Sequence, residues 1–222
     1  MDPKELIARR VAQELRNNTL VNLGIGLPTL VASYVPPGLE VYFQSENGII
    51  GFGARPPEGM EDVHLTDAGG AFVSARPGAV AFDSATSFAL IRGGHLDMTV
   101  LGGLQVDRYG RLANWMVPGH LVPGMGGAMD LVSGARRVIV AMNHTQKGKP
   151  KIVDELTLPA TSLRPVTLIV TEMAVIEPTD KGLVLRETAP GITVETICEA
   201  TGTRLIVPSD VTVMSVGTQV SG

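Results

Sequence analysis

The chain has 222 residues, of which 44% are hydrophobic and 18% are charged, and its formal net charge is -4. This composition excludes a largely disordered chain, which has fewer apolar and more charged residues. The length suits one well-buried domain, and the acidic balance offers no basic surface for nucleic acid. The densest basic cluster, residues 147–151, is short; we expect a solvated loop there, with contact to ligand phosphates as the weaker alternative.

The N-terminal segment, residues 4–17, has the pattern of an amphipathic helix. Ile7, Val11, Ala12 and Leu15 fall on one helical stripe with charged residues opposite, which predicts a helix packed on the domain. The first residues lack the basic region and apolar core of a signal peptide, and no uncharged apolar stretch approaches the length of a bilayer span. We therefore expect a cytoplasmic protein that is neither exported nor embedded in a membrane.

Short apolar runs alternate along the chain with segments of helical spacing. This alternation predicts an α/β domain with an open, largely parallel or mixed sheet flanked by helices. We expect one domain over residues 1–208 and a flexible tail over residues 209–222, because the tail is small and polar. The short apolar runs predict buried strands at residues 21–23, 41–43, 80–82, 98–101, 138–142, 168–171 and 205–207. The expected helices cover residues 29–34, 84–91, 128–135 and 194–200.

The cysteine and histidine content gives little support for a metal site or a disulfide. The single cysteine, Cys198, has apolar neighbours and is expected to be a small core residue in a reducing compartment. The histidines form no helical pair and have no cysteine companion, so each is expected to be a hydrogen-bonded loop or surface residue. They are His64, His95, His120 and His144.

A lone carboxylate, Glu46, stands on an expected tight turn directly after the strand that ends at Phe43. Catalytic side chains in open α/β folds occupy this position at the end of a strand. The alternative is that Asn47 and Gly48 form an ordinary reverse turn and that Glu46 is its solvated neighbour. A serine nucleophile elbow is absent, and Cys198 has no adjacent base in the sequence, so Glu46 is the nucleophile candidate.

Two glycine-rich segments precede helical stretches. Amides of residues 24–28 are placed to face an anion or a carbonyl group at the positive end of a helix, but the third glycine of a dinucleotide fingerprint is missing. Free amides in residues 124–128 suit the oxyanion of an acyl transfer. The alternatives are a tight turn in the first segment and a loop shaped only for chain crossing in the second.

Five motifs, in this order, together resemble the family I coenzyme A-transferases, and among them the β subunits of the acetate or butyrate:acetoacetate type. The resemblance covers the chain from Lys4 to about Ile206 and implies the same CoA-transferase-like α/β fold. The motifs are Val21-Asn22-Leu23-Gly24-Ile25-Gly26-Leu27-Pro28, Ser45-Glu46-Asn47-Gly48, Ile91-Arg92-Gly93-Gly94-His95, Leu112-Ala113-Asn114-Trp115 and Gly124-Met125-Gly126-Gly127-Ala128-Met129-Asp130-Leu131-Val132.

The resemblance implies a ping-pong reaction in which Glu46 becomes a glutamyl-CoA thioester, with coenzyme A as a substrate and no other cofactor. It also implies that the backbone N–H of Gly127 helps to hold the oxyanion, that a further donor comes from the partner, and that the partner is an α subunit in a heterodimer or α2β2 assembly. The residues that it implies for the CoA site are Asn22, Gly26, Gln44, Asn114, Gly126, Gly127 and Ala128.

The resemblance leaves the acid substrate open. Many relatives have a lysine where Gly70 stands, so one expected contact to a CoA phosphate is in doubt, although the acetate and butyrate:acetoacetate members share this glycine. The nearest alternative is a 3-oxoadipate or succinyl-CoA:3-oxoacid transferase. In that case Arg55 would pair with the second carboxylate of the acid, but we expect Arg55 to be an exposed loop residue. A sugar-phosphate sensing module and a noncatalytic assembly subunit are the alternatives from other classes.

Overall fold

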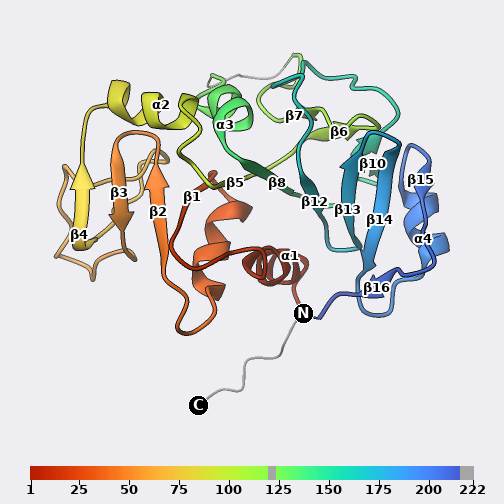
Figure 1. The fold of residues 1–222 in the computed structure, drawn as a ribbon, viewed down its shortest axis with the longest axis horizontal. Helices are drawn as coiled ribbons and strands as arrows, with labels where there is room; N and C mark the ends of the chain where they lie inside the picture. Colours follow the sequence, from red (N-terminus) through yellow and green to blue (C-terminus); the bar gives the residue numbers. More distant parts are fainter. Residues whose placement is uncertain (120–123, 216–222) are drawn as a thin grey trace.

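The structure, a computed structural model, describes residues 1–119 and 124–215. Within them, a mixed sheet of eleven strands runs along the molecule in the order β15-β14-β13-β12-β8-β5-β1-β2-β3-β4, with β16 also paired to β14 (Figure 1). A three-stranded sheet has the order β11-β6-β7, and β9 pairs with β10. The strands are β1 (Thr19–Leu23), β2 (Val41–Ser45), β3 (Ile49–Phe52), β4 (Ala75–Ala81), β5 (Met98–Leu101), β6 (Gln105–Asp107), β7 (Leu112–Ala113), β8 (Arg137–Ala141), β9 (Thr145–Gln146), β10 (Lys149–Pro150), β11 (Ile152–Val153), β12 (Leu168–Val170), β13 (Ala174–Thr179), β14 (Gly182–Thr188), β15 (Leu205–Ile206) and β16 (Thr212–Val213).

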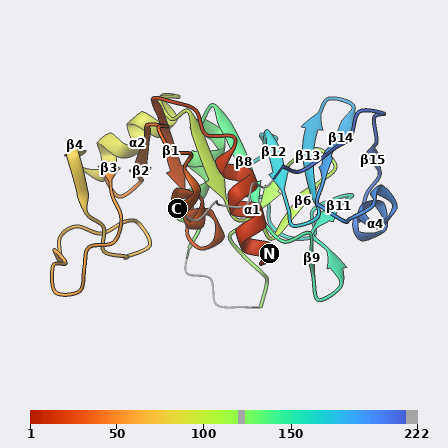
Figure 2. The same ribbon diagram turned by 90° about the horizontal axis from the view of Figure 1, so that it is seen from below.

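Helices cover both faces of the large sheet, which confirms the predicted α/β class. They are α1 (Pro3–Ala12), α2 (Ser84–Arg92), α3 (Ala128–Gly134), α4 (Val194–Ala200) and the 3₁₀ helix η1 (Leu27–Tyr34). Helices α1 and η1 lie on one face, and α2 and α3 lie on the other (Figures 1 and 2). None of the described helices is long and apolar enough to cross a bilayer.

The core is divided by the sheet into two apolar layers, and the central strand β8 contributes to both. Val138 and Val140 pack in the layer of α2 and α3, whereas Ile139 and Ala141 pack in the layer of α1 and η1. Successive side chains of a strand point to opposite faces, so a strand covered on both sides must be apolar at every position. This requirement explains why the continuous apolar run of β8 predicts a buried strand.

Helix α1 is anchored to the sheet by apolar contacts and by a network of ion pairs. The guanidinium of Arg10 donates to Glu187 on β14 at 2.7 Å and to Glu14 at 2.8 Å, and Arg137 on β8 donates to Glu14 at 2.7 Å. Burial favours a lower pKa for Arg10, but its bonds to Glu187 and Glu14 outweigh burial and raise that pKa. The expected packing of this helix on the domain is confirmed, but the helix ends at Ala12 and not at residue 17 as expected.

Two expected buried strands are instead the edges of the large sheet. The run at residues 80–82 belongs to β4, where Val80 is 52% exposed, and the run at residues 205–207 belongs to β15 and its end, where Ile206 and Val207 are exposed. An apolar run indicates a strand, but only its neighbours decide how much of it is covered. An edge strand has a neighbour on one side only, so the prediction of burial was wrong at these residues.

Two further expectations differ from the structure near the C-terminus. Cys198 is exposed, because Ile197 is the residue of α4 that faces the core and the next residue turns away from it. Residues Thr212–Val213 pair with β14, and Met214 is buried, so this part of the expected tail is attached to the sheet. Residues 216–222 lie outside the described residues, and the domain boundary at residue 208 stays a prediction.

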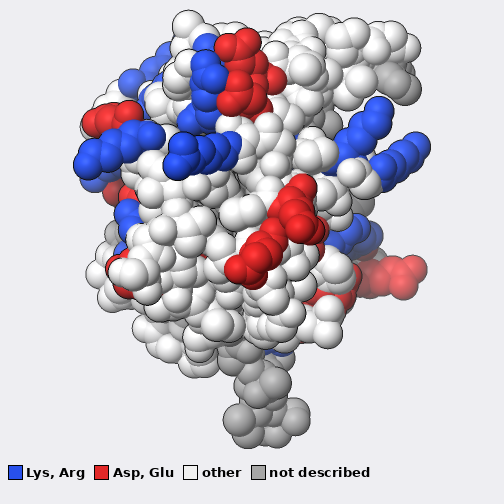
Figure 3. Space-filling model, turned by 90° about the vertical axis from the view of Figure 1, so that its right-hand side faces the viewer, with Lys and Arg blue, Asp and Glu red and all other residues white. Residues whose placement is uncertain are grey.

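Charges on the face beyond α4 and β15 are mixed in sign. In Figure 3, basic and acidic side chains stand close together among uncharged ones on this face. Several of the described ions are paired, for example Arg108 with Asp154 at 2.7 Å. This face therefore presents no continuous basic surface of the kind that binds a nucleic acid backbone.

Candidate active site

The carboxyl ends of the central parallel strands meet at one edge of the sheet, beside α3. Strands β2, β1, β5, β8 and β12 pair in parallel, and β1 lies between β2 and β5. The chain therefore leaves β1 toward one neighbour and later returns to its other side. Open α/β sheets bind their ligands at such a reversal of strand order. A cavity of about 610 Å³ opens at this place.

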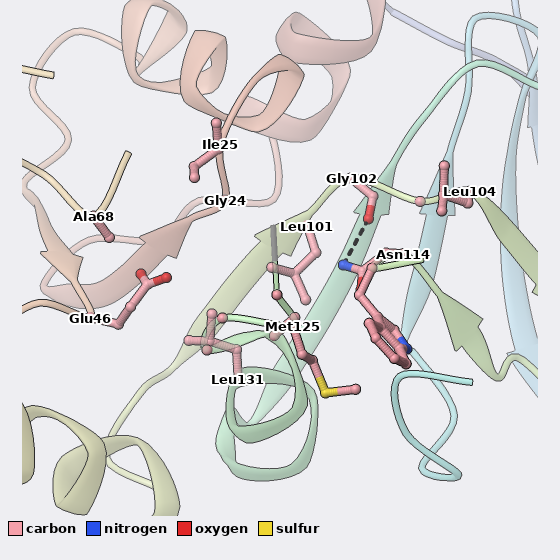
Figure 4. A pocket seen from close by; sticks show the side chains of 16 residues that line it. Gly24, Ile25, Glu46, Ala68, Leu101, Gly102, Leu104, Asn114, Met125 and Leu131 are labelled. Atoms are coloured by element: carbon pink, nitrogen blue, oxygen red, sulfur yellow. Dashed lines mark hydrogen bonds between the residues drawn. The ribbon is translucent and has the colours of Figure 1, made fainter. Parts of the chain in front are cut away.

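Glu46 carries the only charge among the described residues that line this cavity. Figure 4 shows its carboxylate pointing into the space between the ends of β1 and β5 and helix α3. Much of the wall is backbone, because glycine has no side chain to cover it. The glycines of the wall are Gly24, Gly102, Gly103, Gly124, Gly126 and Gly127.

The turn from β2 to β3 places Glu46, as the sequence predicted. Gly48 has a φ of 123° and donates its N–H to Ser45 O at 3.0 Å. A Cβ at Gly48 would lie 2.0 Å from the carbonyl oxygen of Phe82, so only glycine fits. The side chain of Asn47 donates to Thr66 O at 2.7 Å and fixes the turn from its other side.

A buried chain of polar side chains orients the carboxylate. The side-chain N–H₂ group of Asn22 donates to Glu46 Oε2 at 3.0 Å and to Gln44 Oε1 at 2.9 Å. Thr99 in turn donates to Asn22 Oδ1 at 3.3 Å, and Gln44 donates to Ser87 Oγ at 2.8 Å. Asn22, Gln44, Ser87 and Thr99 are all buried, so their rotamers are held by these bonds and by packing.

Gly127, which precedes the first residue of α3, lies beside Glu46 in the wall of the cavity. A Cβ at this position would lie 3.3 Å from Glu46 Cγ and 3.4 Å from Glu46 Oε1, with the ring of Phe88 also at 3.3 Å. Its φ of -80° is open to any residue, so glycine is required here for space. Within the described residues its N–H has no hydrogen-bond acceptor.

Asn114 lines the far side of the cavity but directs its own polar groups into the protein. Its side-chain nitrogen donates to Gly102 O at 3.2 Å, and its Oδ1 accepts from Thr161 Oγ1 at 2.7 Å (Figure 4). These bonds connect the loop after β5 with the end of β7. Asn114 therefore shapes the wall of the cavity.

The structure brings most of the predicted site residues together. Glu46, Asn114, Gly126, Gly127 and Ala128 line the large cavity. Asn22 and Gln44 lie behind the carboxylate, and Gly26 lines neither this cavity nor the smaller one beside it. The assignment of these residues to CoA stays a prediction.

Sequence reasoning missed several residues that build the site. Ser87 and Thr99 are the outer members of the buried polar chain, and for Thr99 a hydroxyl inside the apolar run of residues 98–101 was the available signal. The glycine pair after the strand at residues 98–101 and the Ala68 turn also line the large cavity. Trp115 belongs to one of the five motifs but was not predicted as a site residue. It lines the cavity, and its buried indole N–H has no partner among the described residues.

Neither the histidines nor the loop cations contribute to this cavity in the described structure. No group of metal-ligating side chains occurs among the described residues, and His120 lies outside them. His144 is fully buried between Thr171 and Thr201. Arg55 and the lysines of residues 147–151 line neither the large cavity nor the smaller one.

Comparison with known proteins identifies the family. Residues 4–200 match the family described as coenzyme A transferase. The chain belongs to the coenzyme A transferase family. It is 53% identical to the beta subunit of the acetate CoA-transferase of Escherichia coli (strain K12), over 95% of this chain and 96% of that one. It is 48% identical to a subunit of the succinyl-CoA:3-ketoacid coenzyme A transferase of Helicobacter pylori (strain ATCC 700392 / 26695), over 89% of this chain and 96% of that one.

This CoA-transferase chain is of the β type, as the motifs predicted. Its fold matches the crystal structure of the acyl-CoA transferase YdiF apoenzyme from Escherichia coli O157:H7 with a TM-score of 0.78 at 23% identity. The match covers 97% of this chain but 44% of the YdiF chain, so this chain spans less than half of that protein. At this identity the match demonstrates the fold alone.

Proposed function

We propose that Glu46 is the nucleophile of this CoA-transferase and that the chain moves CoA between an acyl-CoA and a short-chain acid of the acetate, butyrate or acetoacetate type. One observation carries the proposal. A single carboxylate, oriented by Asn22 at 3.0 Å, stands in a cavity of about 610 Å³ at the reversal of strand order. A carboxylate suits a reaction that exchanges one carboxylate for another at a thioester.

In the first half-reaction an oxygen of Glu46 attacks the thioester carbonyl carbon, and the C–S bond breaks to release CoA thiolate and leave a mixed anhydride. The thiolate then attacks the carbonyl carbon of Glu46, and the first acid leaves as its carboxylate with one former oxygen of Glu46. A glutamyl-CoA thioester remains on the enzyme. The acceptor acid reverses these steps, so no metal, oxidant or other cofactor enters the balance.

The backbone N–H of Gly127 supports this chemistry because it has no acceptor among the described residues and belongs to a residue that lies beside Glu46. Negative charge develops on the carbonyl oxygen in each tetrahedral step, and a preorganised N–H donor is worth about a hundredfold to a thousandfold in rate. The large cavity takes the pantetheine arm of CoA, and binding of that remote arm positions the weakly nucleophilic carboxylate. Thioesters that lack the arm are expected to lose kcat.

The acid type in this proposal rests on relatives with different names. The relatives named for acetate and for succinyl-CoA:3-ketoacid transfer are 53% and 48% identical to this chain. These values favour the acetate type by a small margin. We assign acetate, butyrate and acetoacetate because the motifs, including Gly70, follow that group.

A partner α subunit and a cytoplasmic location are parts of the same proposal. The relatives are named as single subunits of their enzymes, the Escherichia coli one as the beta subunit, which supports a partner of the α type in a heterodimer or an α2β2 assembly. The chain alone is expected to have little activity. Measuring CoA exchange by the chain alone and by the complex reconstituted with the α subunit tests this expectation.

The decisive test is to trap the covalent intermediate. The chain, reconstituted with its α subunit, is mixed with acetoacetyl-CoA in the absence of an acceptor and analysed by intact mass. We expect one CoA adduct per β chain, and borohydride reduction followed by peptide mapping should place the modification on the Ser45–Gly48 segment.

Two variants serve as controls for the trapping experiment. Glu46→Gln should form no adduct and exchange no CoA, whereas Glu58→Gln, on the exposed connection between β3 and β4, should behave like the unchanged chain. An adduct on another residue, or none on this chain in an active complex, would refute the proposal. Full activity of Glu46→Gln would show a noncatalytic assembly subunit.

A further inference from the structure

Glu46 stands between two cavities of very different size. Besides the cavity of about 610 Å³, a second one of about 90 Å³ lies on the side of η1 and β3. Glu46 and Ile25 line both of them, and so do Gly24 and Ala68. The carboxylate is therefore at the junction of the two cavities. A single ligand can extend from the large cavity past Glu46 into the small one.

A thioester substrate likewise has a large part and a small part, one on each side of its reacting carbonyl carbon. Its carbonyl carbon must meet an oxygen of Glu46, with the long CoA arm on one side and the acyl substituent on the other. Pockets for drug-sized ligands have volumes of about 300–1,000 Å³, so the large cavity suits the arm and the small one does not. The small cavity has room only for a short chain of carbon atoms.

The described lining of the small cavity contains apolar side chains and no cation. Ala32 and Phe52 are two of the apolar residues, and the hydroxyl of Thr29 is turned to its own backbone and donates to Gly26 O at 2.7 Å. Among the described lining residues the charged side chains are Glu46 and Asp67, both acidic. A second carboxylate on the substrate would thus meet an apolar wall and a like charge.

We infer that the small cavity is the acyl pocket, that Ala32 and Phe52 set the length of chain it accepts, and that it selects monocarboxylic over dicarboxylic acids. This inference rests on the proposed role of Glu46 and extends it to the substrate. It argues against the succinyl-CoA and 3-oxoadipate alternatives for this chain. Arg55, which was considered as a partner for a second carboxylate, does not line the pocket.

The test compares acceptors in the reconstituted complex with acetate, butyrate and succinate. The unchanged enzyme should prefer butyrate to succinate in kcat/KM. Ala32→Leu enlarges a lining side chain and should lower kcat/KM for butyrate about tenfold relative to acetate, since a pocket discriminates by roughly that factor per methylene. Phe52→Leu replaces a large lining side chain by a smaller one and should shift the preference toward acids longer than butyrate.

Two matched controls separate pocket effects from general damage. Ser33→Leu introduces the same side chain at the next position of η1, which is exposed like Ala32 but lines neither cavity, and it should leave the acid ratios unchanged. Asp67→Asn keeps the Oδ1 acceptor for the N–H groups of Gly69 and Ala71 and should raise succinate turnover relative to butyrate.

The inference is overturned if succinate is used as well as butyrate by the unchanged enzyme. It is equally overturned if Ala32→Leu and Ser33→Leu give the same butyrate-to-acetate ratio. Both outcomes are observed with an active enzyme that still forms the trapped adduct, so they leave the proposed role of Glu46 intact. Absence of the adduct in the unchanged active complex overturns that role and the acyl pocket with it.

Discussion

Asn22 distinguishes the two oxygens of Glu46. Its amide holds Oε2, and Oε1 faces Gly127 across the cavity. A carboxylate on a turn could otherwise rotate among several orientations. A displacement of the reacting group by about 1 Å can lower the rate by about a hundredfold. The buried bonds from Thr99 and to Gln44 keep the amide of Asn22 in one orientation.

Replacing Asn22 by alanine should therefore reduce kcat by about tenfold to a hundredfold, with a smaller change in KM for acyl-CoA. Steady-state kinetics of the reconstituted complex measure both. Thr99→Val, one step further from the carboxylate, should have a smaller effect on kcat. Unchanged kcat in a folded Asn22→Ala complex would show that the amide has no positioning role.

His144 gives the fold a dependence on pH that is separate from the active site. Its ring nitrogens bond to Thr171 at 3.0 Å and Thr201 at 2.9 Å, and burial lowers its pKa from 6.5 to about 4. The folded state favours the neutral ring, so this contribution to stability is fully present above pH 6.5 and is lost as pH falls toward 4.

For His144 we expect the free energy of unfolding to fall by about 2 kcal/mol between pH 7.5 and pH 5. Urea unfolding of the unchanged chain and of His144→Gln at both pH values isolates the contribution of His144 to the free energy of unfolding, because the other groups titrate alike in the two proteins. The variant should lose less stability on acidification. An equal loss in both proteins would mean that the ring is already accessible to protons.

At the scale of elements, the turn between β2 and β3 connects the sheet to the chemistry. Gly48 is the residue on which this turn depends, because a side chain there would overlap the carbonyl oxygen of Phe82. Gly48→Ala should destabilise the chain by about 2–4 kcal/mol and displace Glu46, with most of the activity lost. Chemical denaturation and exchange kinetics measure the two effects.

Gly38 offers the matched comparison for that turn. It also has a positive φ, of 79°, but a Cβ there would meet nothing within 4 Å. Gly38→Ala should therefore cost only about 1 kcal/mol and leave exchange of CoA unchanged. Equal stability losses in the two variants would contradict the role assigned to the contact with Phe82.

The elements that the sequence predicted well are those with strong local patterns. Residues 98–101 and 194–200 were expected as a strand and a helix, and β5 and α4 have the same bounds. The hairpin of β13 and β14 was missed, because Pro178 and the charged residues of these strands interrupt the apolar pattern. Edge exposure at Val80 and Ile206 depends on tertiary neighbours, to which a local pattern is insensitive.

The candidate site was also predictable only where it depends on local sequence patterns. Glu46 on its turn and the two glycine-rich segments were recognisable, because turn chemistry is local. The contact of Gly127 with Glu46 and the bond from Asn22 join strands and loops that are distant in the chain. The small cavity beside η1 also depends on tertiary packing, so neither its size nor its lining was predictable.

At the scale of the whole molecule, the sheet brings one carboxylate to the point where the strand order reverses and leaves room on both sides of it. In the described structure, the β-type CoA-transferase chain contributes Glu46, the amide of Asn22 that orients it, and the N–H of Gly127, which has no acceptor among the described residues. In the proposed mechanism the oxygen atoms of the acids must pass through Glu46, because each acid leaves with an oxygen taken from this side chain.

Oxygen-18 transfer tests this claim most directly. The reconstituted complex is incubated with acetoacetyl-CoA and acetate labelled in both carboxylate oxygens, and the peptide that contains Glu46 and the released acetoacetate are analysed by mass. We predict label in the Glu46 peptide and, after further turnovers, in the released acid. Unlabelled Glu46 and unlabelled acetoacetate after many turnovers would contradict the mechanism.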